Sequence, residues 1–202
     1  DRIISSGEAI REVLVTAGGD ADKIVAIPAG VDTAQFHPAV SGTAVRREFG
    51  LNGLVIGTVA MLRHAKGHRV LLQALPEILR REPRAMFLWV GDGVGRVALQ
   101  QEVAEAGVQN KVHMVGFRED IPTCLAAMDV VVLPSIRSDG VPQVVLQALA
   151  MRKPVVASAV GGIPEVIQHQ RTGVLVPPND PQALADAVVQ LLCDPLSAAA
   201  WA

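Results

Sequence analysis

The stretch from residue 130 to residue 158, VVVLPSIRSDGVPQVVLQALAMRKPVVAS, decides the fold of this chain. Its β-branched run at Val130–Leu133 is short, apolar and followed by Pro134, which is typical of a strand buried on both faces of a parallel sheet. Pro142 suits the first position of a helix, where a missing N–H costs little. A second apolar strand begins at Pro154. The stretch therefore predicts a strand, a loop, a helix and another strand.

The same alternation continues on both sides of this stretch. The pattern predicts strands at 2–6, 23–27, 54–60, 86–90, 112–115, 130–133, 154–158 and 173–176, and helices at 7–17, 67–81, 121–128, 142–151 and 180–192, with a further helix ending near 106. Residues 33–41 have little periodicity and several turn-forming residues, so they read as a linker. Strands that alternate with helices at this spacing indicate an α/β fold with a doubly wound, Rossmann-like parallel sheet.

Polar residues of the central stretch point to a ligand. Loops at the carboxyl edge of such a sheet bind ligands, and the N–H groups at the start of a helix attract anions. Asp139, Gln143 and Gln147 are spaced four apart and form a polar stripe on an otherwise apolar helix. Burying such an amide without a partner costs roughly 1 to 3 kcal/mol. Either Gln147 caps a neighbouring backbone group, or the stripe lines a ligand cleft.

Composition narrows the function further. The 202 residues are half hydrophobic, so the chain can bury a large core, and a formal net charge of -2 argues against a nucleic-acid-binding surface. Cys124 and Cys193 match no metal or redox spacing. Both are expected to be buried in the protein core, and the protein is expected to lie in a reducing compartment. No apolar run reaches membrane-spanning length and no signal-peptide pattern begins the chain. We therefore expect a cytoplasmic location, although a targeting segment could have been removed.

A series of short motifs in one order resembles the family-4 nucleotide-sugar glycosyltransferases, which have the GT-B fold. The motifs are Pro28-Ala29-Gly30-Val31-Asp32 followed by Phe36 and Pro38, Leu62 with Lys66-Gly67, Gly91-Asp92-Gly93, Val115-Gly116-Phe117, Asp139-Gly140-Val141-Pro142 through Gln147-Ala148, Gly161-Gly162-Ile163-Pro164-Glu165, and Thr172-Gly173-Val174-Leu175-Val176. Each motif alone is weak evidence, but their order covers nearly the whole chain.

The resemblance implies that this chain is the C-terminal half of a two-domain enzyme. Residues 1–38 would be the end of the N-terminal domain plus a linker, and residues 39–202 the C-terminal nucleotide-sugar-binding domain, truncated at its C-terminal end. The reaction would move a sugar from a nucleoside-diphosphate sugar to an acceptor with retention of configuration, without metal or cofactor. The acceptor, a glycan, a lipid-linked sugar or a small molecule, would be held by the missing N-terminal domain, so we expect the chain alone to be inactive. The full-length protein could act at the inner face of a membrane.

Site residues follow from the same resemblance. Lys66 and Asp139 are the expected catalytic residues, with Lys66 and Arg63 on the diphosphate and Asp139 on the sugar. The N–H groups of the segment from Gly140 to Gln143 would meet the sugar and phosphate, and Gln147 would bond the ribose. The full expected donor-binding set is Arg63, Gly91, Asp92, Gly93, Phe117, Gly140, Val141, Pro142, Gln143 and Gln147.

The chain departs from the family pattern at three positions. Met61 stands where the family usually has Arg, and Asp139 and Gln147 stand where it has Glu. Arg63 is the candidate to replace the missing cation, and Gln147 lacks the charge-assisted strength of a carboxylate. A non-catalytic nucleotide-sugar binder and a nucleotide-sugar epimerase of the same fold therefore remain alternatives.

A nicotinamide-dependent oxidoreductase is a further alternative. It rests on the glycines of Gly91-x-Gly93-x-Gly95 after a strand, which are one residue short of the dinucleotide fingerprint. Asn110 and Lys111 stand where an acidic residue is expected, about 20 residues further on. The sequence does not identify the base, the sugar, the acceptor or the linkage.

Overall fold

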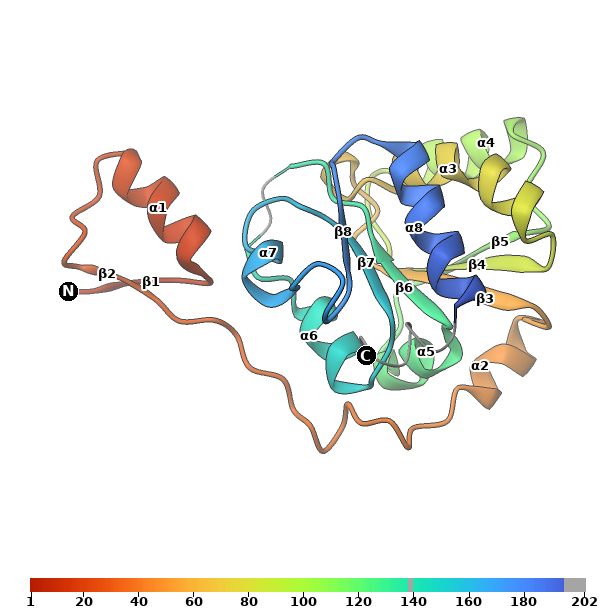
Figure 1. The fold of residues 1–202 in the computed structure, drawn as a ribbon, viewed down its shortest axis with the longest axis horizontal. Helices are drawn as coiled ribbons and strands as arrows, with labels where there is room; N and C mark the ends of the chain where they lie inside the picture. Colours follow the sequence, from red (N-terminus) through yellow and green to blue (C-terminus); the bar gives the residue numbers. More distant parts are fainter. Residues whose placement is uncertain (138–139, 195–202) are drawn as a thin grey trace.

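The computed structural model describes residues 1–137 and 140–194. It contains two parallel sheets, each with its own helices (Figure 1). A small N-terminal unit contains β1 (Ile3–Ser5), α1 (Glu8–Thr16) and β2 (Ile24–Ala26), with β1 and β2 paired in parallel. Residues 27–42 then run without helix or strand to the second unit. The predicted linker therefore has no regular structure, while the boundary at residue 38 stays a prediction.

The second unit is built on a six-stranded parallel sheet in the order β5-β4-β3-β6-β7-β8. Its strands are β3 (Leu54–Val59), β4 (Ala85–Val90), β5 (Val112–Gly116), β6 (Val130–Leu133), β7 (Val155–Ser158) and β8 (Val174–Val176). The chain winds outward from β3 to β5 on one side and from β6 to β8 on the other, so the strand order reverses between β3 and β6. The predicted doubly wound sheet is confirmed, and the reversal is where such folds bind ligands.

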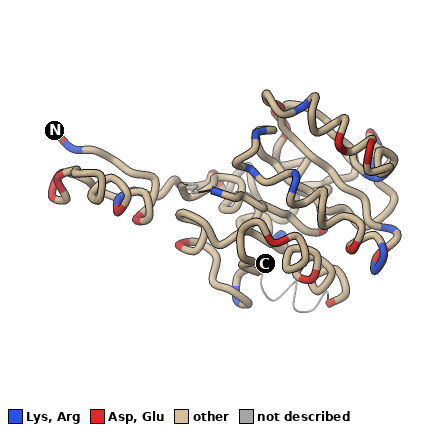
Figure 2. The backbone as a smooth tube through the Cα atoms, turned by 90° about the horizontal axis from the view of Figure 1, so that it is seen from above, with Lys and Arg blue, Asp and Glu red and all other residues tan. Residues whose placement is uncertain are grey.

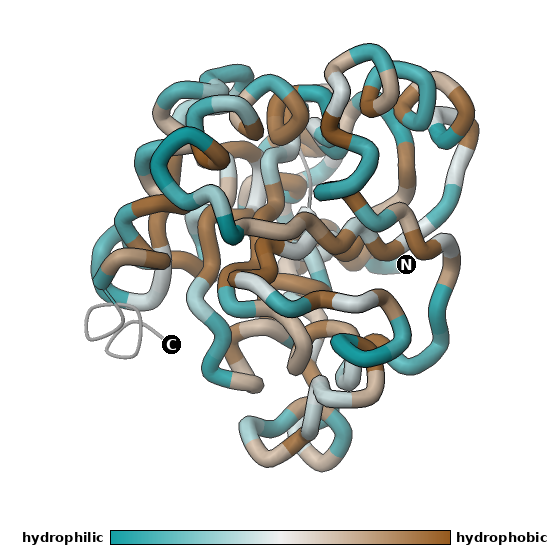
Figure 3. The backbone as a smooth tube through the Cα atoms, turned by 90° about the vertical axis from the view of Figure 1, so that its right-hand side faces the viewer, coloured by the Kyte–Doolittle hydropathy of each residue, from teal (hydrophilic) through white to brown (hydrophobic). Residues whose placement is uncertain are grey.

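Helices cover both faces of this sheet. One core joins the sheet to α3 (His68–Arg81), α4 (Arg96–Glu105) and α8 (Pro181–Cys193), and the other joins it to α2 (Thr43–Glu48), α5 (Ile121–Ala127), α6 (Gln143–Ala150) and α7 (Ile163–Val166). Strand β6 is buried along its whole length, with Val130 and Val132 in the first core and Val131 and Leu133 in the second. Apolar residues accordingly concentrate along the strands in the interior (Figure 3).

Three details differ from the sequence-based expectations. Helix α6 begins at Gln143, because Pro142 has an extended backbone with ψ of 125° and stands just before the helix. The short helices α2 and α7 were not predicted, since six and four residues are too few to show a helical period. Cys124 is buried as expected, but Cys193 is exposed at the last turn of α8.

The surface carries charges of both signs. Lys and Arg alternate with Asp and Glu along the backbone tube rather than forming one block of a single sign (Figure 2), in line with the near-balanced net charge. Within residues 1–137 and 140–194, no helix combines the length and the apolar character needed to cross a membrane.

The core also contains a histidine at the first position of α3. His68 is 2% exposed, and neither of its ring nitrogens has a hydrogen-bond partner within residues 1–137 and 140–194. Its ring packs edge-on against Trp89, with the ring centroids 5.5 Å apart. Burial, and then the positive charge of Lys66, lower the pKa of His68 to about 4. The imidazole is therefore neutral in the folded protein at neutral pH.

We expect this histidine to make the fold acid-sensitive. The unfolded chain gains a proton at His68 as the pH falls through 6.5, whereas the folded chain does so only near 4, so stability is present above 6.5 and is lost as the pH falls toward 4. Between pH 7 and pH 4.5 the loss due to His68 should be roughly 2.5 kcal/mol in the free energy of unfolding. Urea unfolding at both pH values measures it.

The variant His68→Leu should lose correspondingly less stability over this pH interval. Val97→Leu is the matched control, because Val97 is 77% exposed on α4 and has no titratable group, and the pH dependence of this variant should equal that of the wild type. An equal acid-induced loss in His68→Leu and wild type would contradict the assignment.

Candidate functional site

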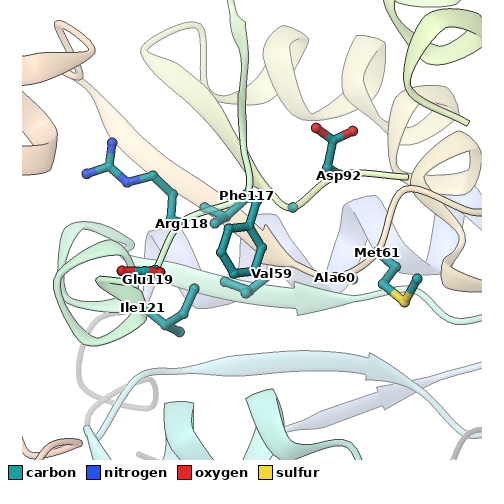
Figure 4. A pocket seen from close by; sticks show the side chains of 10 residues that line it. Val59, Ala60, Met61, Asp92, Phe117, Arg118, Glu119 and Ile121 are labelled. Carbon is teal, nitrogen blue, oxygen red and sulfur yellow. The ribbon is translucent and has the colours of Figure 1, made fainter. Parts of the chain in front are cut away.

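The carboxyl ends of β3, β4 and β5 open into a cavity of about 720 Å³, within the size range of small-molecule sites (Figure 4). Its lining residues are Val59, Ala60, Met61, Val90, Gly91, Asp92, Phe117, Arg118, Glu119 and Ile121. Most of the wall is apolar. Phe117 is part of this wall, and it is 76% exposed. An apolar cavity with an exposed aromatic ring can hold a flat, partly apolar group such as a nucleobase.

Backbone hydrogen bonds fix the two loops on one side of this cavity. The amide of Ala60 donates to the carbonyl of Val90 at 3.0 Å, and that of Leu62 donates to Asp92 at 2.9 Å. The amide of Gly95 donates back to the carbonyl of Leu62 at 2.8 Å. The loop after β3 and the loop after β4 are thus joined, as if the pairing of their strands continued beyond the sheet.

Glycines permit this close approach. A Cβ atom at Gly91 would lie 2.0 Å from the carbonyl oxygen of Ala60, and one at Gly93 would lie 2.7 Å from that of Leu62. Gly91 also has a φ of 134°, which favours glycine. The glycine spacing that suggested a dinucleotide fingerprint is therefore accounted for by packing between loops of the same protein.

Two charged groups on the cavity wall are held by neighbours. One carboxylate oxygen of Asp92 accepts from the amide of Gly93 at 2.7 Å, and the other pairs with Arg96 at 3.4 Å. Asp92, an expected donor-binding residue, therefore lines the cavity and also braces its own loop.

Arg118 is held more firmly. Its guanidinium donates to both carboxylate oxygens of Asp120, at 2.7 and 2.8 Å, and to Glu48 at 2.7 Å. These bonds raise the pKa of Arg118 and lower that of Asp120. Glu119, between them in sequence, is exposed at the cavity and has no hydrogen bond or ion pair within the described ranges 1–137 and 140–194.

The loop after β3 also carries the expected phosphate-binding cations. It contains the 3-10 turn η1 (His64–Lys66), which ends at Gly67 with a φ of 72°. Lys66 is half-buried on this turn, and Arg63 just before it is exposed. Among the residues that the structure describes, the guanidinium of Arg63 has no partner, so it can reach an anion. Met61, which replaces the expected Arg, is 57% exposed at the cavity.

This loop meets the loop after β6 at the reversal of strand order. The amide of Ile136 donates to the carbonyl of Ala65 at 3.0 Å. A Cβ atom at Gly67 would lie 1.7 Å from the carbonyl oxygen of Pro134, so only glycine fits there. The turn that carries Lys66 is therefore anchored beside the loop that leads to α6.

Helix α6 contributes two expected residues. The side-chain amide of Gln143 donates to the carbonyl of Gly30 at 2.6 Å, which ties α6 to the irregular segment 27–42. Gln147 is half-buried, and its amide has no hydrogen-bond partner in the described part of the chain. The interpretation that Gln147 caps a neighbouring backbone group thus finds no support there. Val141 and Pro142 are buried at the start of α6, next to the half-buried Gly140, and Asp139 lies outside the described residues.

The expected residues thus occupy three adjacent places. Gly91, Asp92 and Phe117 line the cavity, Arg63 and Lys66 lie on the loop after β3, and Gln143 and Gln147 lie on α6. Sequence reasoning missed six residues of the cavity wall: two end β3 and β4, one directly follows β3, two follow Phe117 and one begins α5. They are Val59, Ala60, Val90, Ile121, Arg118 and Glu119. For Val59, Ala60 and Val90, the signal that could have found them is their position at the carboxyl ends of predicted strands.

Comparison with known proteins places this site in a family. Residues 53–194 match the family model described as glycosyl transferases group 1. The chain is 35% identical to the GDP-mannose-dependent alpha-(1-6)-phosphatidylinositol monomannoside mannosyltransferase of Mycolicibacterium smegmatis, a match that covers 94% of this chain and 52% of that protein. It is 34% identical to the alpha-D-kanosaminyltransferase of Streptomyces kanamyceticus, over 75% of this chain and 40% of that protein. The chain thus spans about half the length of the curated relatives it matches.

Solved structures agree. A crystal structure of Anabaena HepE in complex with UDP and glucose superposes with a TM-score of 0.93 at 29% identity, covering 99% of this chain and 55% of that one. A crystal structure of the C-terminal domain of a glycosyl transferase group 1 family protein from Francisella tularensis gives a TM-score of 0.75 at 28% identity, covering 85% of this chain and 92% of that one. The resemblance drawn from the sequence motifs is confirmed.

The glycine at the mouth of the cavity provides a test of the joined loops. Gly91→Ala should lower the free energy of unfolding by about 3 kcal/mol, because a methyl group there meets the carbonyl of Ala60 and the backbone is strained as well. Gly50→Ala is the matched control, since Gly50 has a φ of 62° but open space around its Cβ. It should cost about 1 kcal/mol from strain alone. Equal losses in urea unfolding would show that the close approach is absent.

Proposed function

The chain belongs to the glycosyl transferases group 1 family, and from this premise we propose that it binds the nucleoside-diphosphate-sugar donor of a retaining glycosyltransferase. One observation carries the proposal: a base-sized apolar cavity opens directly beside a loop with two basic residues, next to the reversal of strand order. A nucleotide sugar has the matching sequence of groups, a flat base followed by a charged diphosphate. Relatives named for GDP-mannose and structures named with UDP support this class of donor.

In the proposed complex the base lies in the cavity against Phe117. The diphosphate runs toward Arg63 and Lys66, where two cations and the first N–H groups of α3 offset its charge. The sugar then faces the start of α6, and Gln147 bonds the ribose hydroxyls. Gln147 suits this role because its amide is half-buried without a protein partner among the described residues.

The proposed chemistry needs charge stabilisation more than a protein base. The bond from the anomeric carbon to the diphosphate oxygen breaks while the acceptor oxygen bonds to the same face of that carbon. The departing phosphate accepts the acceptor's proton, so the chain supplies positive charge to the leaving group. Arg63 supplies the positive charge that Met61, at the position of the family's usual Arg, lacks. The acceptor is held by a domain outside this chain.

The phosphate assignment predicts a selective loss. Lys66→Ala should weaken binding of UDP or GDP roughly 10- to 100-fold, the usual worth of a charge-assisted hydrogen bond, and should leave binding of uridine or guanosine nearly unchanged. Isothermal titration with each pair of ligands measures this. Lys23→Ala is the matched control, because Lys23 pairs with Asp20 in the N-terminal unit, and it should bind all four ligands as the wild type does. Equal weakening of nucleoside and nucleotide by Lys66→Ala would refute the assignment.

The placement of the base against Phe117 predicts an equal loss of affinity for nucleoside and nucleotide. Phe117→Ala should weaken nucleoside and nucleoside diphosphate by the same factor, roughly 3- to 10-fold, because it removes a stacking surface and no charge. The same titrations apply. Val97→Ala is the control, since Val97 is 77% exposed on α4 and outside the cavity wall. Unchanged affinity in Phe117→Ala would place the base elsewhere.

A further inference from the structure

One contact between the two units joins Glu8 and Glu165, which are 157 positions apart. Glu165 of α7 places one carboxylate oxygen 2.9 Å from the amide of Glu8 and the other 2.8 Å from the amide of Ala9. Both amides belong to the first turn of α1, where helix N–H groups lack partners within the helix. The residue before α1 is Gly7, which has no side chain to cap them. A carboxylate from the second unit therefore caps a helix of the N-terminal unit.

Glycines on both sides allow the close approach at this contact. A Cβ atom at Gly7 would lie 2.9 Å from Glu165 and 3.0 Å from the side chain of Val141. A Cβ atom at Gly140 would lie 2.3 Å from the hydroxyl oxygen of Ser6. Gly7 has a φ of 170°, which any residue adopts, so its absent side chain matters for the approach and not for the backbone. The two units are fitted to each other at this point.

The contact lies beside Gly140 and Val141, the segment that leads into α6. Gly140 and Val141 touch the N-terminal unit directly and precede the helix that carries Gln143 and Gln147. We propose that Glu165 is the closing residue of a latch, whose carboxylate holds the N-terminal unit against Gly140 and Val141 and whose release lets that unit move away.

The latch is tested by a distance measurement on the 202-residue chain. Spin labels at Glu12→Cys on α1 and Gln190→Cys on α8 report the position of one unit relative to the other, since both residues are exposed. Cys193→Ser removes the exposed native thiol, and burial raises the pKa of the Cys124 thiol to about 11, which protects it from labelling. Pulsed electron spin resonance then gives the distance distribution.

We expect a single narrow distribution in the labelled parent and a broad one in Glu165→Ala, with the undocked population rising roughly 5- to 30-fold, as for loss of a helix cap. Asp180→Ala is the matched control, because Asp180 caps α8 within its own unit, accepting from Ala183 at 2.9 Å, and its distribution should stay narrow. A broad distribution in the parent, or a narrow one in Glu165→Ala, would overturn the latch. No nucleotide is needed, so failure to bind UDP or GDP would count against the proposed function alone.

Discussion

Close contact between backbones at the carboxyl edge of the sheet is the constraint on which the rest of the site depends. The loop after β3 bonds to the loop after β4 through Leu62 and meets the loop after β6 through Ala65. Each approach is too close to leave room for a side chain, so positions 91 and 67 are both occupied by glycine. Because these atoms are backbone, the contact positions three loops without using any side chain that could bind a ligand.

Charges near the cavity divide into two groups. Arg118 and Asp92 are occupied by protein partners, and they fix the shape of the wall. Arg63 and Glu119 have no such partner among the described residues and face solvent. An unpaired Arg can form charge-assisted hydrogen bonds with an anion. The paired residues build the cavity, and the unpaired ones are the groups that a ligand can meet.

The N-terminal unit is connected to this site by side chains rather than by a continuous sheet. Glu165 of the second unit reaches the start of α1, and Gln143 reaches the carbonyl of Gly30 in the segment between the two units. Both hydrogen bonds involve exposed groups, which makes them easier to break than a packed apolar interface. The two units can therefore separate more readily than if they shared one apolar core.

The sequence by itself determined the alternation of strands and helices, because hydrophobic periodicity is a local property of the chain. It placed β6 on both cores, and it identified the loops of Lys66, Gly91 and Phe117, since those motifs are contiguous in sequence. It also gave the family. It did not find α2 and α7, which are shorter than the period needed to recognise a helix.

Only the tertiary structure decided what the individual side chains do. The pairing of Arg118 with Glu48, the approach of Gly91 to Ala60 and the capping of α1 by Glu165 all join residues that are distant in sequence. No local pattern encodes such contacts, because they arise when the parallel sheet brings separate loops to one edge. For the same reason Arg118, Glu119 and Ile121 could not be predicted as part of the cavity wall, because they lie past the end of a strand and share only a place in space with the other lining residues.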